Sequence, residues 1–273
     1  MFPPVAELGK NELTIRHSAD GFSYAVYNIE RQQFTEIKNH FKSGISLKET
    51  IAGIEAENSC EIRHFNKISV IFDNCRNTFV PASVFQNQIK SKYLDILGLT
   101  NENSVVCDDF IKSAEAHNVY AVSAEDFDTL QKNTEKTVFH HASSVLVASL
   151  VNDNMERTDD IRIYLNIKNQ SFEMTVLKGA NLLFDNNFRF KTKEDFLYFL
   201  LFSTEQLHID TSSVPVYFLG MIEEKSKLVD LTARYVRDIR FMRRDNEIGL
   251  AQELEETPFY FHYILYKSIK CAL

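Results

Sequence analysis

A repeated order of strands and helices constrains the fold of this chain more than any other feature. The segment 162–219 contains three alternating runs of β-branched and aromatic residues, then an apolar helix candidate, then a wholly apolar run. The three alternating runs cover 162–167, 171–177 and 182–190, and short polar reversals separate them. We therefore predict three antiparallel strands, a helix packed on them, and a buried strand covered on both faces.

The same order occurs near the start of the chain. Runs over 13–18, 22–29 and 33–41 form a second meander, Ser46 and Glu49 have the spacing of a capping box, and 67–72 is another apolar strand. The sequence thus predicts an α/β protein with mixed sheets and two lobes, each with a β-β-β-α-β-α core. We expect the first lobe at 1–151, with an inserted segment over about 77–122, and the second at 161–273.

The end of the second lobe has a weaker pattern. We predict a helix over 223–236, a strand over 239–242 and a terminal helix over 258–269 that is crowded with aromatic residues. Aromatic residues at helical spacing usually form core, so we interpret the terminal helix as buried. A docking face for a partner is the alternative interpretation of the same residues.

Charge and hydrophobicity exclude several classes of protein. A formal net charge of −8 repels nucleic acid and anionic lipid on average. One basic cluster, Arg234 to Arg244, is interpreted as a solvated face, and a nucleic-acid adaptor that uses it is the least favoured hypothesis. The longest apolar run, 196–202, is far shorter than the roughly 20 residues that span a bilayer, and the N-terminus lacks a signal-peptide pattern. We expect a cytoplasmic protein without membrane insertion.

Motifs that carry chemistry are absent or weak. The cysteines show no zinc or disulfide spacing, and no phosphate-loop, dinucleotide, nucleophile-elbow or zinc-protease pattern occurs. The pair His140-His141 has no acid at a motif spacing, so we interpret both as ordinary polar histidines. Asp108-Asp109 and Asp159-Asp160 are neighbours that point to opposite faces of a strand, which predicts solvated charges rather than a catalytic dyad.

Two consecutive lobes of this order resemble the fold of actin, sugar kinases and Hsp70, which is built from two ribonuclease H-like halves. More closely, the chain resembles an uncharacterised bacterial family, a domain of unknown function with an actin-like ATPase fold. It is also similar to the actin-like proteins of type IV pilus and type II secretion assembly. The resemblance covers nearly the whole chain and is strongest over 162–219, where 178–184 matches the turn between the second and third strands.

The resemblance implies a particular phosphate chemistry. In active relatives the first hairpin of each lobe carries an Asp-x-Gly loop, whose amides reach the phosphates while the carboxylate holds magnesium and its waters. The matching positions here are 16–18 and 166–168, which read Arg-His-Ser and Asn-Ile-Lys. Active relatives also have two glycines after the last buried strand, whereas this chain has Gly220 followed by Met221. The dipeptide Asp20-Gly21 is better explained as turn chemistry.

Four positions therefore match degenerate nucleotide loops and are the candidate cofactor-binding residues: Ser18, Asn166, Lys168 and Gly220. No catalytic residue and no metal ligand is predicted, since loss of the carboxylates removes the metal clamp of both nucleases and phosphoryl transferases. The first hypothesis is a pseudo-ATPase, a non-catalytic scaffold or adaptor that takes no cofactor, binds another protein and has surfaces for self-association. The alternative is an active or weak ATPase or kinase that binds Mg-ATP between its lobes through Lys168, His17 and the backbone near Gly220.

Overall fold

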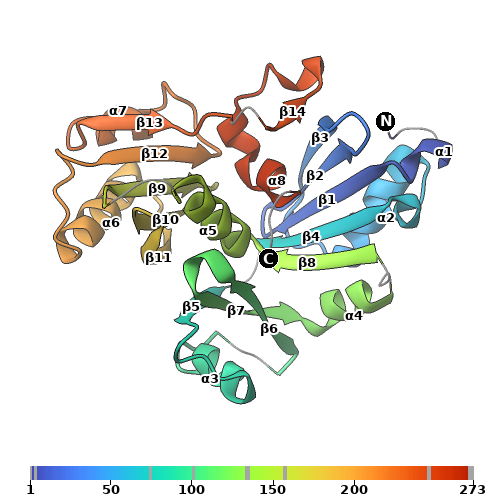
Figure 1. The fold of residues 1–273 in the computed structure, drawn as a ribbon, viewed down its shortest axis with the longest axis horizontal. Helices are drawn as coiled ribbons and strands as arrows, with labels where there is room; N and C mark the ends of the chain where they lie inside the picture. Colours follow the sequence, from blue (N-terminus) through green and yellow to red (C-terminus); the bar gives the residue numbers. More distant parts are fainter. Residues whose placement is uncertain are drawn as a thin grey trace. The chain divides into compact units, whose positions relative to one another are not determined.

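The computed structural model describes residues 2, 5–73, 76–99, 102–132, 136–155, 159–244 and 247–269 of the 273-residue chain. The chain divides into two compact units, whose elements Figure 1 labels. Unit 1 contains Met1–Ala148, Asn246–Glu256 and Ile264–Leu273, and unit 2 contains Ser149–Asp245 and Thr257–Tyr263. The domain limits expected from the sequence, 1–151 and 161–273, stay a prediction.

Unit 1 is built on a six-stranded mixed sheet with the order β14-β3-β2-β1-β4-β8. Its strands are β1 (Asn11–Ser18), β2 (Gly21–Asn28), β3 (Gln33–Phe41), β4 (Lys67–Asp73), β8 (Thr137–His141) and β14 (Gly249–Leu250). The first three form the predicted antiparallel meander, and β4 pairs parallel to β1. Residues 68–72 of β4 are all buried, so the strand is covered on both faces, which explains its apolar sequence.

Helix α2 (Leu47–Asn58) of unit 1 begins at the capping box that the sequence indicates. Unit 1 also contains α1 (Val5–Leu8) and α4 (Ala124–Lys132). The capping box of α2 is confirmed, since Ser46 Oγ accepts a hydrogen bond from the Glu49 amide and Glu49 Oε2 accepts one from the Ser46 amide. Asp126 of α4 accepts a hydrogen bond from the amide of Leu47 at 2.7 Å, so α4 fixes the start of α2.

Residues 77–123 of unit 1 form a small antiparallel sheet with the order β5-β7-β6. Its elements are β5 (Asn77–Pro81), α3 (Lys90–Asp95), β6 (Ser104–Ile111) and β7 (Ala116–Ser123). Helix α3 closes one face, where Val80, Leu94 and Val119 make a small core. After β8, helix α5 (Ala142–Asp153) continues the chain.

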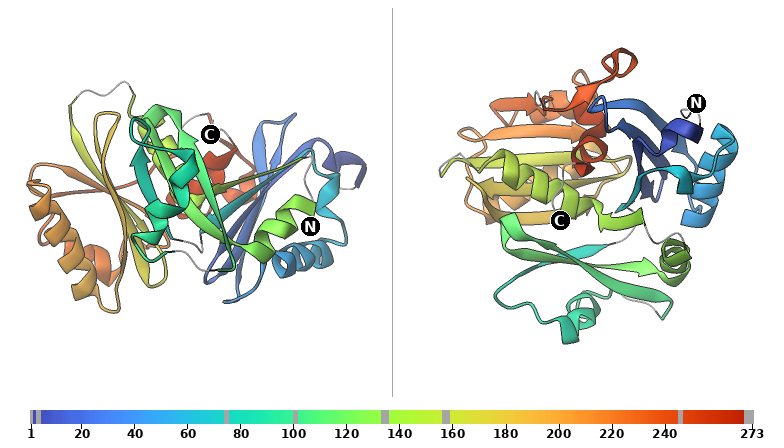
Figure 2. Two further views of the ribbon diagram at one scale, coloured as in Figure 1. Left: turned by 90° about the horizontal axis from the view of Figure 1, so that it is seen from below. Right: turned by 45° about the vertical axis from the view of Figure 1, so that its right-hand side comes forward.

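Unit 2 repeats the meander, helix and buried strand in a five-stranded sheet of order β11-β10-β9-β12-β13. The elements are β9 (Ile161–Ile167), β10 (Ser171–Lys178), β11 (Asn181–Arg189), α6 (Lys193–Gln206), β12 (Pro215–Gly220) and β13 (Asp238–Phe241). Figure 2 shows α6 lying along one side of this sheet, and Phe196 of α6 packs on Phe172 with ring centroids 4.6 Å apart. The duplicated order and the mixed sheets predicted from the sequence are confirmed.

Two expectations for the C-terminal part of the chain have different outcomes. The helix predicted over 223–236 is wrong in extent, because α7 covers only Lys227–Thr232. Ser226 caps it by accepting a hydrogen bond from the Val229 amide, while the Ser226 amide bonds back to Glu223 and closes a turn. The aromatic terminal segment, 3-10 helix η6 (Phe259–His262) and α8 (Tyr263–Ser268), contains buried Tyr260, Tyr263 and Tyr266, which confirms the core interpretation. None of the helices described is both long and apolar enough to cross a membrane.

Candidate functional site

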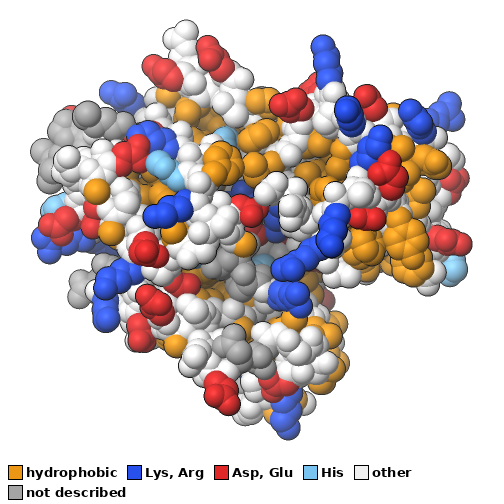
Figure 3. Space-filling model, turned by 180° about the vertical axis from the view of Figure 1, so that it is seen from behind, with side chains coloured by type: hydrophobic (Ala, Val, Ile, Leu, Met, Phe, Trp, Pro, Cys, Tyr) orange, Lys and Arg blue, Asp and Glu red, His pale blue; other side chains and the backbone are white. Residues whose placement is uncertain are grey.

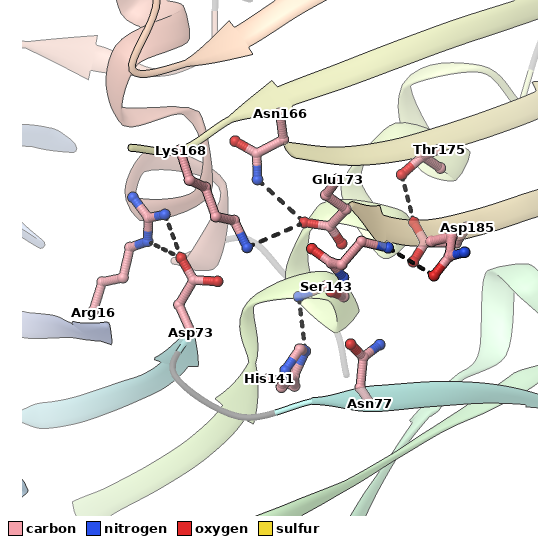
Figure 4. A network of polar contacts seen from close by, with 12 residues as sticks. Arg16, Asp73, Asn77, His141, Ser143, Asn166, Lys168, Glu173, Thr175 and Asp185 are labelled. Atoms are coloured by element: carbon pink, nitrogen blue, oxygen red, sulfur yellow. Dashed lines mark hydrogen bonds and ion pairs between the residues drawn. The ribbon is translucent and has the colours of Figure 1, made fainter. Parts of the chain in front are cut away.

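The end of β1, where the resemblance implies a phosphate loop, carries a buried ion pair. Nε of Arg16 donates a hydrogen bond to Oδ2 of Asp73 at 2.9 Å, and Nη2 of Arg16 contacts the same oxygen (Figure 4). The Asp73 side chain is 2% exposed and the Arg16 side chain is 16% exposed. Strand β4 ends with Asp73 beside the end of β1, so parallel pairing of the two strands brings the charges together. A carboxylate is therefore present here, but a guanidinium already neutralises it.

His17 and Ser18, which follow Arg16, serve local structure. His17 is buried, its Nδ1 lies 3.2 Å from the hydroxyl of Thr50, and burial lowers the pKa of its imidazole, against which the charge of Asp126 acts. The hydroxyl of Ser18 donates to the carbonyl oxygen of Gly21 at 2.9 Å and closes the hairpin turn. Neither side chain offers a positive charge to a phosphate.

The matching strand end in unit 2 carries a second cation beside a buried acid. Asn166 near the end of β9 lies opposite Glu173 of β10 and donates a hydrogen bond from Nδ2 to Glu173 Oε2 at 3.2 Å. Lys168 Nζ lies 3.8 Å from the same oxygen (Figure 4). Glu173 is 0% exposed, and its Oε1 has no hydrogen-bond partner among the residues described. Both predicted polar residues of this loop are thus directed at Glu173.

A further acid lies on the same face of the unit 2 sheet. Asp185 of β11 is opposite Thr175 of β10, and the Thr175 hydroxyl donates to Asp185 Oδ1 at 2.6 Å. Burial raises the pKa of Asp185 well above its ordinary value, and the charge of Glu173 raises it further. The face therefore contains one fully buried acid, Glu173, one half-buried acid, Asp185, and one lysine.

Replacing Asp185 with asparagine should stabilise the protein at neutral pH by on the order of 1 kcal/mol. A raised pKa in the folded state means that folding favours the protonated acid, so stability is lost as pH rises from the ordinary value of 3.8 through the raised value. Asparagine removes this penalty and keeps an oxygen for the Thr175 hydroxyl. Urea unfolding at pH 7 and pH 4 should show a gain that shrinks at the lower pH. An equal gain at both pH values, or the same gain for Asp159→Asn, whose side chain is 94% exposed, would contradict this assignment.

Gly220 ends β12 in a conformation that requires glycine. Its φ is +85°, and a Cβ atom there would lie 2.3 Å from the carbonyl oxygen of Ile167 and 2.6 Å from Oδ1 of Asn166. The next amide, of Met221, donates to the Ile167 carbonyl at 2.7 Å. Gly220 therefore allows the chain leaving β12 to pass close over the end of β9.

The structure brings three of the four predicted site residues together in unit 2, namely Asn166, Lys168 and Gly220, and places Ser18 in unit 1. Sequence reasoning missed the acids that pair with them. For Glu173 a signal existed, because a two-residue reversal at 169–170 places residue 173 opposite residue 166. For Asp73 no local signal existed, since its partner Arg16 is 57 residues away.

Asp109 corrects another expectation, because it is not a solvated charge. It is 6% exposed on β6 and accepts hydrogen bonds from His140 Nδ1 at 3.0 Å, the His141 amide at 2.8 Å and the Tyr120 hydroxyl at 3.3 Å. The Asp109 carboxylate joins the small sheet to β8. No local motif in the sequence indicates this long-range contact. Its neighbour Asp108 points to the other face and pairs with Lys90.

The remaining candidates are clusters of metal ligands and the basic cluster at 234–244. Within the ranges that the structure describes, no group of three His, Cys, Asp or Glu residues is placed to hold a metal ion. The arginines at 234, 237, 240, 243 and 244 are exposed, as the solvated-face interpretation expects. Of these, Arg240 is engaged by Asp238 at 2.7 Å and by the Tyr217 hydroxyl at 2.9 Å.

Comparison with solved structures identifies the fold. A Bacteroides thetaiotaomicron protein with an actin-like ATPase fold and unknown function superposes with a TM-score of 0.75 at 17% identity, covering 89% of this chain and 94% of that chain. The PilM-PilN type IV pilus biogenesis complex gives a TM-score of 0.59 at 10% identity, covering 99% of this chain and 100% of that chain. The actin-like ATPase fold expected from the resemblance is confirmed.

Sequence comparisons give the family. No match is found among curated proteins. A family model with the description "Protein of unknown function (DUF3822)" matches residues 5–239, most of the 273-residue chain. The resemblance to an uncharacterised family of actin-like fold is thereby confirmed, and the chain belongs to the DUF3822 family.

Proposed function

We propose that this chain is a non-catalytic scaffold or adaptor of actin-like fold that binds another protein. One observation carries the proposal: in each unit, the acid beside the former phosphate loop is buried and faces a cation of the same unit. In unit 1 the pair is Arg16 with Asp73, and in unit 2 it is Lys168 with Glu173. These charges stabilise the two strand ends.

The donors at the two loops do not fit a magnesium ion. Mg²⁺ requires oxygen ligands and is usually held beside phosphates by one or two carboxylates. At the first loop the matching position holds Arg16, which would repel the ion, and Asp73 has its Oδ2 engaged by two guanidinium nitrogens. At the second loop Asn166 directs its amide nitrogen, a donor, toward Glu173. The two loops therefore do not support phosphoryl transfer through a bound metal ion.

The residues that an unfamiliar ATPase would need are also engaged. Lys168 is 17% exposed on its side chain and lies within 3.8 Å of a fully buried carboxylate, so its charge is partly compensated before any phosphate arrives. His17 is 1% exposed and its pKa is lowered by burial, so its neutral form is favoured at neutral pH. Gly220 lets the backbone that leaves β12 pass close to the end of β9.

The protein partner is proposed by analogy. One solved structure of this fold is named as a complex of PilM with PilN, so the fold occurs in an assembly between two proteins. A shared fold does not show that two proteins have the same partner or pathway. From the PilM-PilN complex we therefore propose for this chain only that it binds a protein.

Calorimetric titration of the full chain with Mg-ATP, Mg-ADP and ATP without metal tests the proposal. We expect no binding heat up to millimolar nucleotide, because the loops lack free carboxylates and glycines. Micromolar binding that requires magnesium would contradict the proposal and favour the ATPase alternative. That alternative then predicts steady phosphate release that disappears in the Lys168→Ala variant, with Lys178→Ala, a lysine 47% exposed at the other end of β10, as the control.

A further inference from the structure

The two repeated sheets differ at the outer edge of their third strand. In unit 1 the chain itself covers that edge: β14 pairs parallel to β3, with Gly249 opposite Gln33 and Leu250 opposite Phe34. The amide of Ala251 extends the pairing by donating to the Phe34 carbonyl at 2.9 Å. A short extended segment thus pairs with the start of this edge, at Gln33 and Phe34.

In unit 2 the equivalent strand is β11, the third of its meander, and it ends the order of the described sheet. It runs for 9 residues without proline, and no strand among the residues described pairs with its outer side. Edge strands are usually shortened, covered, bulged or charged, because their unpaired N–H and C=O groups accept an additional strand. Strand β11 has a bulge after Leu182 and charges at Asp185 and Arg189, but none of the strands described covers its outer side. Leu183 on this strand is 47% exposed.

Helix α6 adds an aromatic surface beside β11. Its Phe196 and Leu200 are buried against the sheet, but the helix is apolar on its outer side too, where Tyr198 is 59% exposed and Phe202 is 45% exposed. Their rings stack at 5.7 Å, and Phe199 stacks on Phe188 of β11 at 5.2 Å. Figure 3 shows hydrophobic side chains gathered on the right, where the reversed view places α6 and β11. Exposed apolar patches of this kind mark interaction sites.

The charges around this surface are basic at one end. Arg189, Lys191 and Lys193, at the end of β11 and the start of α6, are exposed in a chain whose net charge is −8. Glu194 and Asp195 lie at the same end, and Asp195 is held by the amides of Lys191 and Thr192, so the three cations leave an excess of positive charge. The one ion pair found for them among the described residues joins Lys193 to Glu194 at 3.8 Å, which is weak in water. An occupant of the surface should therefore carry acidic residues at this end.

The segment that covers β3 has the chemistry such an occupant needs. Buried Ile248 and the β14 residue Leu250 are followed by Glu253, Glu255 and Glu256, so an apolar extended part leads into an acidic part. The same order laid parallel on β11 would set apolar side chains beside Leu183 and acids beside the basic end.

We propose that the β11–α6 surface, formed by Leu183, Arg189, Lys191, Lys193, Tyr198 and Phe202, binds an extended segment of another protein by strand addition. The bound segment has apolar residues followed by acidic residues. This inference rests on the scaffold function proposed above and specifies the surface through which the scaffold contacts its partner. Main-chain hydrogen bonds to β11 give affinity, and the aromatic and basic side chains give specificity.

A second copy of the chain fits the same surface poorly. Parallel pairing of β11 with itself would bring the two basic ends together, and antiparallel pairing about its centre would set each Arg189 opposite Asn181, which offers no acid. Like charges directly opposite each other destabilise a strand pair.

Selection from a phage-displayed library of random dodecapeptides on the full-length protein tests the proposal. We expect enriched peptides with an apolar half followed by an acidic half. Fluorescence anisotropy should show at least tenfold weaker binding of the best peptide to Leu183→Lys and to the pair Arg189→Glu and Lys191→Glu. The matched control is Ile96→Lys in unit 1, which is 82% exposed and should bind normally. Bound peptide should slow hydrogen exchange in β11.

Several outcomes would overturn the inference. The first is a library that yields no binder, and the second is a set of peptides that bind the β11 variants as tightly as they bind the parent protein. The third is a dimer, detected by light scattering, that the Leu183→Lys substitution converts to a monomer. This third outcome would assign the surface to a second copy of the chain. Nucleotide titration of the same preparations separates the two proposals. Magnesium-dependent ATP binding with intact peptide binding would overturn the non-catalytic function alone, whereas absent nucleotide heat with unaffected β11 variants would overturn this surface alone.

Discussion

Replacing Arg16 with methionine should lower the free energy of unfolding by about 3 to 5 kcal/mol, the range for removal of one partner from a buried ion pair. The reason is the carboxylate of Asp73, 2% exposed, which loses the guanidinium that donates to its Oδ2. Methionine has a similar length and keeps most of the apolar packing of the arginine stem. Urea unfolding at pH 7, followed by circular dichroism, measures the change.

The double variant Arg16→Met with Asp73→Leu is the matched control. Removing both charges leaves no buried ion to stabilise, so the double variant should recover most of the loss. A single variant within about 1 kcal/mol of the parent would contradict the assignment of a desolvated pair and would indicate a solvent-screened contact. The same result would remove the main support for the view that Arg16 neutralises Asp73 at the first loop.

Local patterns in the sequence were enough to predict most of the fold. Each meander strand alternates polar and apolar residues, and Ser46 with Glu49 marks a helix start by itself. In contrast, β14 has only 2 residues, too few for any periodicity, and it forms because its backbone meets the edge of β3. The helix expected over 223–236 failed because Ser226 offers a cap inside the periodic stretch.

Whether a site residue could be placed from the sequence depended on the pairing register of its strand. The short reversal after β9 allows Glu173 to be placed opposite Asn166 by counting. Counting from the next turn fails, because a bulge between Val176 and Leu177 shifts the pairing of β10 with β11 by one residue. A one-residue shift moves a side chain to the other face, so counting would have placed Asp185 on the apolar side.

Charge pairs between distant strands could not be predicted from the sequence, because they depend on how the strands are ordered and paired. Arg16 meets Asp73, and Asp109 meets His140, only after the strand order is known, and these contacts span 57 and 31 residues. The sequence could show that the expected carboxylates were missing from the loops. It could not show that other carboxylates lie beside them and are already paired.

Replacing Gly220 with alanine should lower the free energy of unfolding by about 3 kcal/mol or more, because two effects of about 1 to 3 kcal/mol each act together. The backbone has a φ of +85°, which L-residues rarely adopt, and the added methyl group would lie 2.3 Å from the Ile167 carbonyl oxygen. That oxygen belongs to the main chain and accepts the Met221 amide, so it cannot move without breaking this hydrogen bond. Urea unfolding at pH 7 measures the loss.

Gly44→Ala separates the two effects. Gly44 also has a positive φ, +73°, but an added Cβ would meet nothing within 4 Å, so only the conformational strain of about 1 kcal/mol should appear. Equal losses for the two variants would mean that the end of β9 yields to the methyl group, and the close approach would then not explain the glycine. A much larger loss for Gly220→Ala would assign this glycine to the backbone crossing, and its presence at a position that matches a nucleotide loop would need no nucleotide to explain it.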